Sequence, residues 1–120
     1  MKTEIKNIIL AFEAASATRN IEKLKNILHP DYRVVANRFK GASHAVIIRK
    51  DQYLAMTQDE TIGGTSYQTD IIYISITDHT AMVEVLLKSN NSSDMHKYLF
   101  LIQDAEDQWQ VVGDLPLIIE

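Results

Sequence analysis

Apolar residues near the start of the chain recur with the period of an α-helix. Between positions 5 and 15 they follow the i, i+3, i+4, i+7 spacing, and polar residues, Glu13 among them, occupy the opposite face. A second, shorter helix is predicted after Asn20, which is a suitable N-cap, with an apolar stripe that ends at Leu28. Because the residue before a proline avoids the α region, we expect this helix to stop at His29-Pro30 and a strand to start at Asp31.

The rest of the chain has mainly strand character. A strand over residues 31–39, a turn at Gly41 and a short β-rich segment at 44–48 precede a third predicted helix over 50–57. Four further strands follow, at residues 67–77, 80–88, 95–103 and 108–118. The turns between them are short and polar, so neighbouring strands are expected to pair antiparallel. Helices followed by a long antiparallel sheet are typical of the α+β class, and the length predicts one domain, residues 1–120.

Alternation along the strands divides their side chains between two faces of the sheet. The face with Trp109 and Val111 is the more uniformly apolar, and we assign it to the helices. The opposite face mixes apolar, aromatic and charged side chains, which is unlike a solvated sheet face and typical of an interface. We predict a homodimer formed sheet against sheet through Glu84, Leu86, His96, Tyr98, Phe100 and Ile102. The alternative is that the strands curl enough to bury both faces within one chain.

Charge and composition exclude several classes of function. The net charge is −4 and the largest basic cluster is Arg49-Lys50, so nucleic acid is not an expected partner. The absence of cysteine excludes disulfides, thiolate metal sites and a cysteine nucleophile. The N-terminal apolar run covers only residues 8–12, whereas a secretion signal needs about 7–15 apolar residues and a membrane span about 18. We therefore expect a cytoplasmic protein that does not bind membranes.

Several segments carry a resemblance to a known family. They are LHPDYRVV (28–35), RKDQYLAM (49–56), TAMVEVLL (80–87) and KYLFLIQDAEDQWQVV (97–112). In these the chain resembles the nuclear transport factor 2-like superfamily, and within it the SnoaL-like and lumazine-binding-type domains of bacteria. The resemblance implies a cone-shaped, cystatin-like α+β fold, in which three N-terminal helices pack in the concavity of a strongly bent, mostly antiparallel sheet and leave a pocket. The superfamily includes isomerases, cyclases, dehydratases, binding domains and assembly modules, so the fold does not select a reaction.

The best-defined chemistry implied by this resemblance is that of ketosteroid isomerase, which uses a carboxylate base, a tyrosine and a protonated aspartate. The resemblance places the tyrosine at Phe12, the base at Ala36 or Asn37, and the third group within residues 98–100. None of these positions holds the required side chain, so we predict that this catalytic set is absent. The resemblance to SnoaL-like cyclases implies a carboxylate base near the end of the sheet. Asp114 is the weak candidate for this base, and strand alternation predicts that its side chain faces away from the helices.

Histidine chemistry offers one further candidate. Glu84 and His96 lie on adjacent predicted strands, so they form either an acid–base dyad or a cross-strand ion pair that fixes the register of the strands. We favour the cross-strand ion pair. The four histidines lack the close spacing of a metal site, and Gly63-Gly64 lacks the spacing of a nucleotide-binding loop. We therefore expect no metal and no cofactor.

A pocket remains as the candidate site. Strand and helix faces predict walls made of Phe12, Tyr32, Val34, Tyr53, Lys97, Leu99, Trp109 and Val111. Such an apolar, aromatic cleft suits a small apolar ligand, and the same residues also suit an ordinary core. We favour a dimeric small-molecule-binding protein over an enzyme. The alternatives are a SnoaL-like isomerase or cyclase acting on a cyclic carbonyl compound, with Asp114 or His96 as base, and a module that docks another protein through its sheet.

Overall fold

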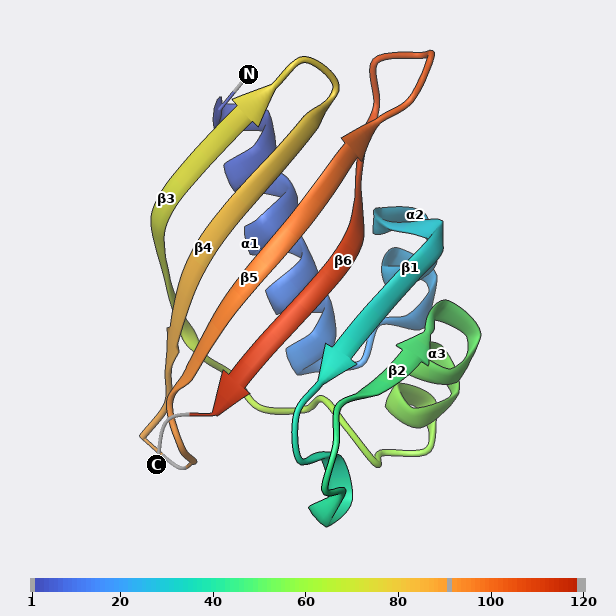
Figure 1. Cartoon of the computed structure of the whole chain (residues 1–120), viewed down its shortest axis with the longest axis vertical. Helices are drawn as coiled ribbons and strands as arrows, with labels where there is room; N and C mark the ends of the chain where they lie inside the picture. Colours follow the sequence, from blue (N-terminus) through green and yellow to red (C-terminus); the bar gives the residue numbers. More distant parts are fainter. Residues whose placement is uncertain (1, 91, 119–120) are drawn as a thin grey trace.

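The helices of this protein lie against one face of a curved sheet (Figure 1). The computed structural model describes residues 2–90 and 92–118. The helices are α1 (Lys2–Thr18), α2 (Ile21–Ile27) and α3 (Lys50–Gln58), with a short 3-10 turn, η1 (Phe39–Gly41). The strands are β1 (Leu28–Ala36), β2 (Val46–Arg49), β3 (Gln68–Thr77), β4 (Thr80–Lys88), β5 (Met95–Gln103) and β6 (Trp109–Ile118).

The six strands form one sheet in the order β2-β1-β6-β5-β4-β3. The β1–β6 pair is parallel and all the other pairs are antiparallel. Figure 1 shows α1 crossing the sheet while α2 and α3 lie beside β1 and β2. This arrangement confirms the predicted α+β cone, in which helices fill the concavity of a mostly antiparallel sheet.

The second helix ends close to the predicted position. Asn20 caps α2, because its side chain accepts a hydrogen bond from the backbone N–H of Lys23 at 3.2 Å. The helix ends at Ile27, but β1 already begins at Leu28, so the expectation that the strand starts at Asp31 was wrong. Pro30 fits inside this strand because the register between β1 and β6 is irregular from Leu28 to Arg33, where a ladder hydrogen bond is not required.

A lysine at the start of α3 joins it to the end of α2. The ammonium of Lys50 donates hydrogen bonds to the backbone carbonyls of Lys25 and Leu28, each at 2.9 Å. Carbonyls at the end of a helix have no partner within the helix, and the helix dipole favours a cation there. This contact fixes α2 against α3 and thereby positions β1, which follows α2 directly.

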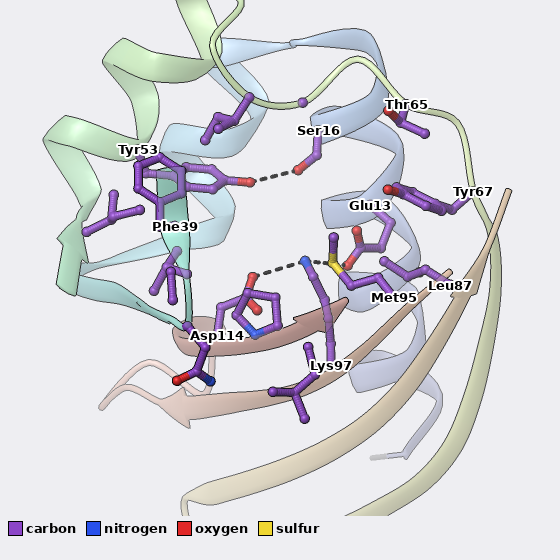
Figure 2. A pocket seen from close by; sticks show the side chains of 18 of the residues that line it. Glu13, Ser16, Phe39, Tyr53, Thr65, Tyr67, Leu87, Met95, Lys97 and Asp114 are labelled. Carbon is purple, nitrogen blue, oxygen red and sulfur yellow. Dashed lines mark hydrogen bonds and ion pairs between the residues drawn. The ribbon is translucent and has the colours of Figure 1, made fainter. Parts of the chain in front are cut away.

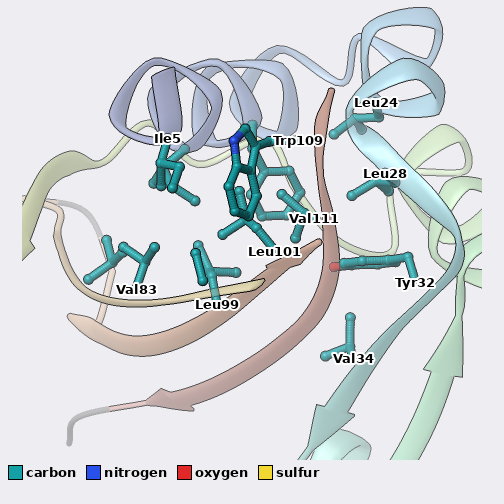
Figure 3. Packing of buried hydrophobic residues seen from close by; sticks show 14 of the residues in the cluster. Ile5, Leu24, Leu28, Tyr32, Val34, Val83, Leu99, Leu101, Trp109 and Val111 are labelled. Carbon is teal, nitrogen blue, oxygen red and sulfur yellow. The ribbon is translucent and has the colours of Figure 1, made fainter. Parts of the chain in front are cut away.

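The core lies between the helices and the inner face of the sheet. Alternate residues of β4 and β5 are buried there, as the sequence pattern predicts. Figure 3 shows these side chains packed with residues of α1, α2 and β1. Its fully buried members are Ile5, Ile9, Phe12, Leu24, Leu28, Tyr32, Val83, Val85, Leu99 and Val111.

A β-bulge in β6 changes which face its last residues occupy. Leu101 pairs with Val111 and Phe100 pairs with Gly113, so Val112 has no opposing residue on β5. One extra residue in a strand moves every later side chain to the opposite face. Asp114 therefore lies opposite Leu99 and is buried, with 4% of its surface exposed. The prediction that Asp114 faces away from the helices was wrong for this reason.

Candidate functional site

A cavity of about 420 Å³ opens between α1, α3, the sheet and the segment 59–67. We call its exposed lining residues the mouth and its buried lining residues the floor. The mouth consists of Asn37, Arg38, Lys40, Gly63 and Leu117. The floor consists of Glu13, Val34, Ala36, Ile48, Tyr53, Leu87, Lys97 and Asp114. Half-buried residues, including Phe39 and Met95, form the walls between them.

Three ionisable side chains meet on the floor. The ammonium of Lys97 donates hydrogen bonds to Asp114 Oδ2 at 3.0 Å and to Glu13 Oε2 at 3.3 Å. Figure 2 shows Lys97 reaching from β5 between these two carboxylates, one on α1 and one on β6. The same ammonium lies 5.0 Å from the centroid of the Phe12 ring, a cation–π arrangement. All three groups are at least nine-tenths buried, so each depends on the others for compensation of its charge.

Burial and mutual charge set the protonation of this cluster. Burial alone would lower the pKa of Lys97, but the carboxylates of Asp114 and Glu13 outweigh it and raise that pKa above its usual value. Burial raises the pKa of Glu13, and the neighbouring Asp114 raises it further, against the opposing effect of Lys97. Two carboxylates share one cation, so Lys97 offsets only part of the effect of burial and the pKa of Glu13 lies above its ordinary value.

Two tyrosines extend the polar group. The Tyr32 hydroxyl donates to Asp114 Oδ2 at 3.3 Å, and the Tyr53 hydroxyl lies 3.0 Å from Ser16 Oγ. Burial raises the pKa of Tyr53 to about 12 and that of Tyr32 well above its ordinary value. Both phenols therefore keep their protons at physiological pH and act as neutral hydrogen-bonding groups. Of the two, only Tyr53 lines the cavity.

Comparison with known proteins places this fold and site in a family. Residues 1–115 match the family described as "Putative lumazine-binding". The chain belongs to this family. The match, together with the solved structures below, confirms the resemblance to the nuclear transport factor 2-like superfamily. No curated protein sequence matches the chain.

Solved structures share the fold of this family member over nearly the whole chain. A nuclear transport factor 2-like protein of unknown function from Silicibacter pomeroyi has a TM-score of 0.81 at 17% identity, covering 98% of this chain and 94% of its own. One from Shewanella baltica has a TM-score of 0.82 at 9% identity, covering 99% and 94%. A protein with a cystatin-like fold from Caulobacter vibrioides has a TM-score of 0.67 at 19% identity, covering 99% and 89%. These identities establish the fold alone.

The cavity of this lumazine-binding family member includes part of the predicted pocket. Val34, Tyr53 and Lys97 line it. Five other predicted lining residues are buried in the core between the helices and the sheet and do not line the cavity. They are Phe12, Tyr32, Leu99, Trp109 and Val111. The indole N–H of Trp109 is buried and has no hydrogen-bond partner among the described residues.

The positions implied by ketosteroid isomerase carry no catalytic group in the structure. Ala36 and Asn37 both line the cavity, and neither has a carboxylate. Phe12 occupies the tyrosine position and has no hydroxyl. The acidic groups enter the cavity elsewhere, from α1 and from β6.

Glu13 is the ionisable residue of the cavity floor that sequence reasoning missed. It was placed on the polar face of the first helix, yet 8% of its surface is exposed and it reaches Lys97. A signal was available, because Glu13 follows Ile5 and Ile9 at successive intervals of four residues and so lies on the edge of the apolar stripe. A carboxylate at such a position requires a buried cation from another element.

His96 and Glu84 lie on the outer face of the sheet, opposite the cavity. His96 Nε2 and Glu84 Oε2 are 2.8 Å apart, a cross-strand contact between β5 and β4. The described residues include no group of three or more histidines or carboxylates placed to hold a metal ion. Within residues 2–90 and 92–118, no helix has the length and apolar character needed to cross a bilayer.

Proposed function

We propose that this protein is a dimeric binding protein for a small, largely apolar molecule that occupies the cavity. The observation that carries this proposal is the cavity of about 420 Å³, which has apolar walls and a few polar groups gathered on its floor. That combination of size, apolar lining and convergent polar groups is typical of small-molecule sites. The description of the family suggests a flat heterocycle such as lumazine as one candidate ligand.

Hydrogen-bonding capacity on the floor supports a ligand that carries carbonyl or amide groups. The ammonium of Lys97 has three N–H groups, and two of them are donated to carboxylates. The Tyr53 hydroxyl is a second polar group on the floor, and it shares a hydrogen bond with Ser16 Oγ in which either oxygen can be the donor. Asp114 Oδ1 is fully buried and has no hydrogen-bond partner among the described residues. A ligand with acceptor groups at one end matches the donors on the floor.

The dimer part of the proposal rests on the outer face of the sheet. Phe100 is 42% exposed, and Tyr98, Leu86 and Ile102 lie half-buried beside it. The Glu84–His96 pair lies in the same patch, so in a two-fold dimer it would lie near the Glu84–His96 pair of the second copy. An apolar patch rimmed by polar residues is typical of an interface between protein chains.

A thermal-shift screen tests the binding proposal. The protein is heated with flavin-like, steroid-like and polyketide-like compounds, and a bound compound raises the melting temperature. The matched control is Ala36→Phe, because Ala36 is a small floor residue and a phenyl ring there fills the cavity. We expect at least one class to stabilise the wild type and not the variant. If no compound shifts the wild type, or the variant responds equally, binding in the cavity is refuted.

One observation favours a second candidate function, an isomerase or cyclase acting on a cyclic carbonyl compound. Asp114 lies on the cavity floor with two donors, Lys97 and Tyr32, on one of its oxygens. A carboxylate in reach of a bound substrate can take a proton from the carbon next to a carbonyl. The test is deuterium uptake by cyclic ketones in heavy water, followed by NMR. Exchange that exceeds the buffer rate and is lost in Asp114→Asn would support the enzyme, and exchange at the buffer rate would exclude it for the ketones used.

A further inference from the structure

The charges of the cavity differ between its floor and its mouth. On the floor, the two carboxylates and the one ammonium contact one another. At the mouth, Arg38 and Lys40 are the charged residues, and no acidic residue is among the described mouth residues. The floor has one more carboxylate than ammonium, whereas the charge at the mouth is positive, so an anionic group on a ligand would be attracted to the mouth.

Arg38 is the less compensated of the two basic residues. Its side chain makes no ion pair or hydrogen bond within the described part of the chain, although it lines the cavity. Lys40 lies 5.5 Å from the centroid of the neighbouring Phe39 ring and is near Asp59. Hydrogen bonds from Thr61 lower the pKa of that carboxyl, and Lys40 lowers it further. The guanidinium of Arg38 thus keeps its full set of donors for a ligand.

The backbone that carries these residues is strained. Arg38 and Lys40 both have left-handed conformations, with φ of 56° and 51°. Side chains other than glycine, asparagine and aspartate rarely adopt this region, and such strain is concentrated at ligand sites. A turn that needed only this conformation would be better served by asparagine or glycine. The basic side chains at these two positions therefore require an explanation beyond the turn itself.

We propose that the ligand is an anionic amphiphile, whose apolar body fills the cavity and whose carboxylate, phosphate or sulfonate is bound at the mouth by Arg38, assisted by Lys40. This inference rests on the proposed binding function and specifies the chemical class of its ligand. The planar fork of an arginine matches two oxygens of an oxyanion and forms short, charge-assisted hydrogen bonds. The apolar walls, which include Phe39 and Met95, lie between this anchor and the polar floor.

Two fluorescent probes with closely related bodies test the proposal. 1-Anilinonaphthalene-8-sulfonate carries an anion, and N-phenyl-1-naphthylamine is the same aromatic body without it. We expect the wild type to bind the sulfonate more tightly than the neutral probe. In Arg38→Asn and Lys40→Asn, asparagine tolerates the left-handed backbone, so the turn is kept while the charge and the long side chain are removed. Arg38→Asn should lower the affinity for the sulfonate about three- to tenfold and change the affinity for the neutral probe less than about twofold.

Two control variants separate the possible failures. Lys6→Asn removes the same charge from an exposed position of α1 outside the cavity lining and should leave both affinities unchanged. Ala36→Phe should abolish the binding of both probes, because the phenyl ring fills the space above the cavity floor. If the wild type binds the two probes with equal affinity, or if Arg38→Asn loses affinity for both probes equally, the proposal of an anionic ligand is overturned. The proposed binding function would still stand. Binding of neither probe by the wild type, or sulfonate binding that survives in Ala36→Phe, would overturn the inference together with its cavity location.

Discussion

Lys97 on β5 donates a hydrogen bond to Asp114 on β6 across 3.0 Å, and both side chains are buried on the inner face of the sheet. Asp114 has an inward position because Val112 is an extra, unpaired residue in β6. The parallel strand β1 adds Tyr32, whose hydroxyl also donates to Asp114. The bulge thus adds Asp114 to the polar group on the cavity floor, where it joins Lys97 from β5 and Glu13 from α1.

Removal of the buried cation should be strongly destabilising. In Lys97→Met the carboxylates of Glu13 and Asp114 remain buried without a counter-charge, which costs about 3–5 kcal/mol of unfolding free energy. Urea denaturation measures the loss, and Lys88→Met is the matched control because Lys88 is exposed at the end of β4. The triple variant that also carries Glu13→Gln and Asp114→Asn should recover most of the loss. Equal stability of Lys97→Met and Lys88→Met would contradict the role of the cluster.

The raised pKa of Glu13 predicts how stability depends on pH. The folded state holds the Glu13 proton more tightly than the unfolded state, so the contribution of this group is present below its ordinary pKa of 4.5 and is lost as pH rises through the raised value. Glutamine imitates the neutral form and does not titrate. The stability of Glu13→Gln relative to wild type should therefore increase as pH rises from about 4 to neutrality.

Urea denaturation at a series of pH values checks this difference between the two proteins. Lys97 and Asp114 face Glu13 in both of them. Lys97 has a raised pKa and stays charged throughout this range, so it does not contribute to the slope. A relative stability that is constant with pH, or that falls as pH rises, would show that Glu13 does not have a raised pKa.

Two glycines provide a matched test of the segment that borders the cavity. Gly63 and Gly41 have nearly equal φ values of 78° and 77°, so alanine suffers the same backbone strain at both, about 1–2 kcal/mol. A Cβ at Gly63 would lie 2.9 Å from the backbone oxygen of Ser16 on α1, whereas one at Gly41 meets nothing within 4 Å. Gly63→Ala should therefore lose more stability than Gly41→Ala in urea denaturation. Equal losses would mean that the close approach between this segment and α1 has no energetic importance.

The proposed dimer predicts that a charge in the outer patch produces a monomer. In Tyr98→Glu a carboxylate would be placed beside the Glu84–His96 pair and, in a dimer, near its own symmetry copy. Sedimentation velocity gives the mass of the particle in solution. Leu10→Glu is the matched control, because Leu10 is 47% exposed on α1, which lies on the opposite side of the sheet from the proposed interface. A Tyr98→Glu protein that remains dimeric would refute this interface.

The helices, most strand boundaries and most of the core follow from local patterns in the sequence. The predicted strands at 80–88 and 95–103 match β4 and β5 residue for residue, because strand alternation and helical period are local properties of the chain. The inward set of β4 and β5, including Val83 and Leu99, followed from the same alternation. The resemblance to the superfamily then supplied the cone and the presence of a pocket.

Only the tertiary structure decided which polar groups occupy that pocket. The bulge at Val112 arises from pairing between β5 and β6. Gly113 beside it is a local sign of a bulge, but strand alternation takes no account of it and placed Asp114 on the wrong face. The burial of Glu13 likewise requires a cation from a strand 84 residues further along the chain. A buried charge is stable only beside its partner, and the partner is known only once the distant segments are packed together.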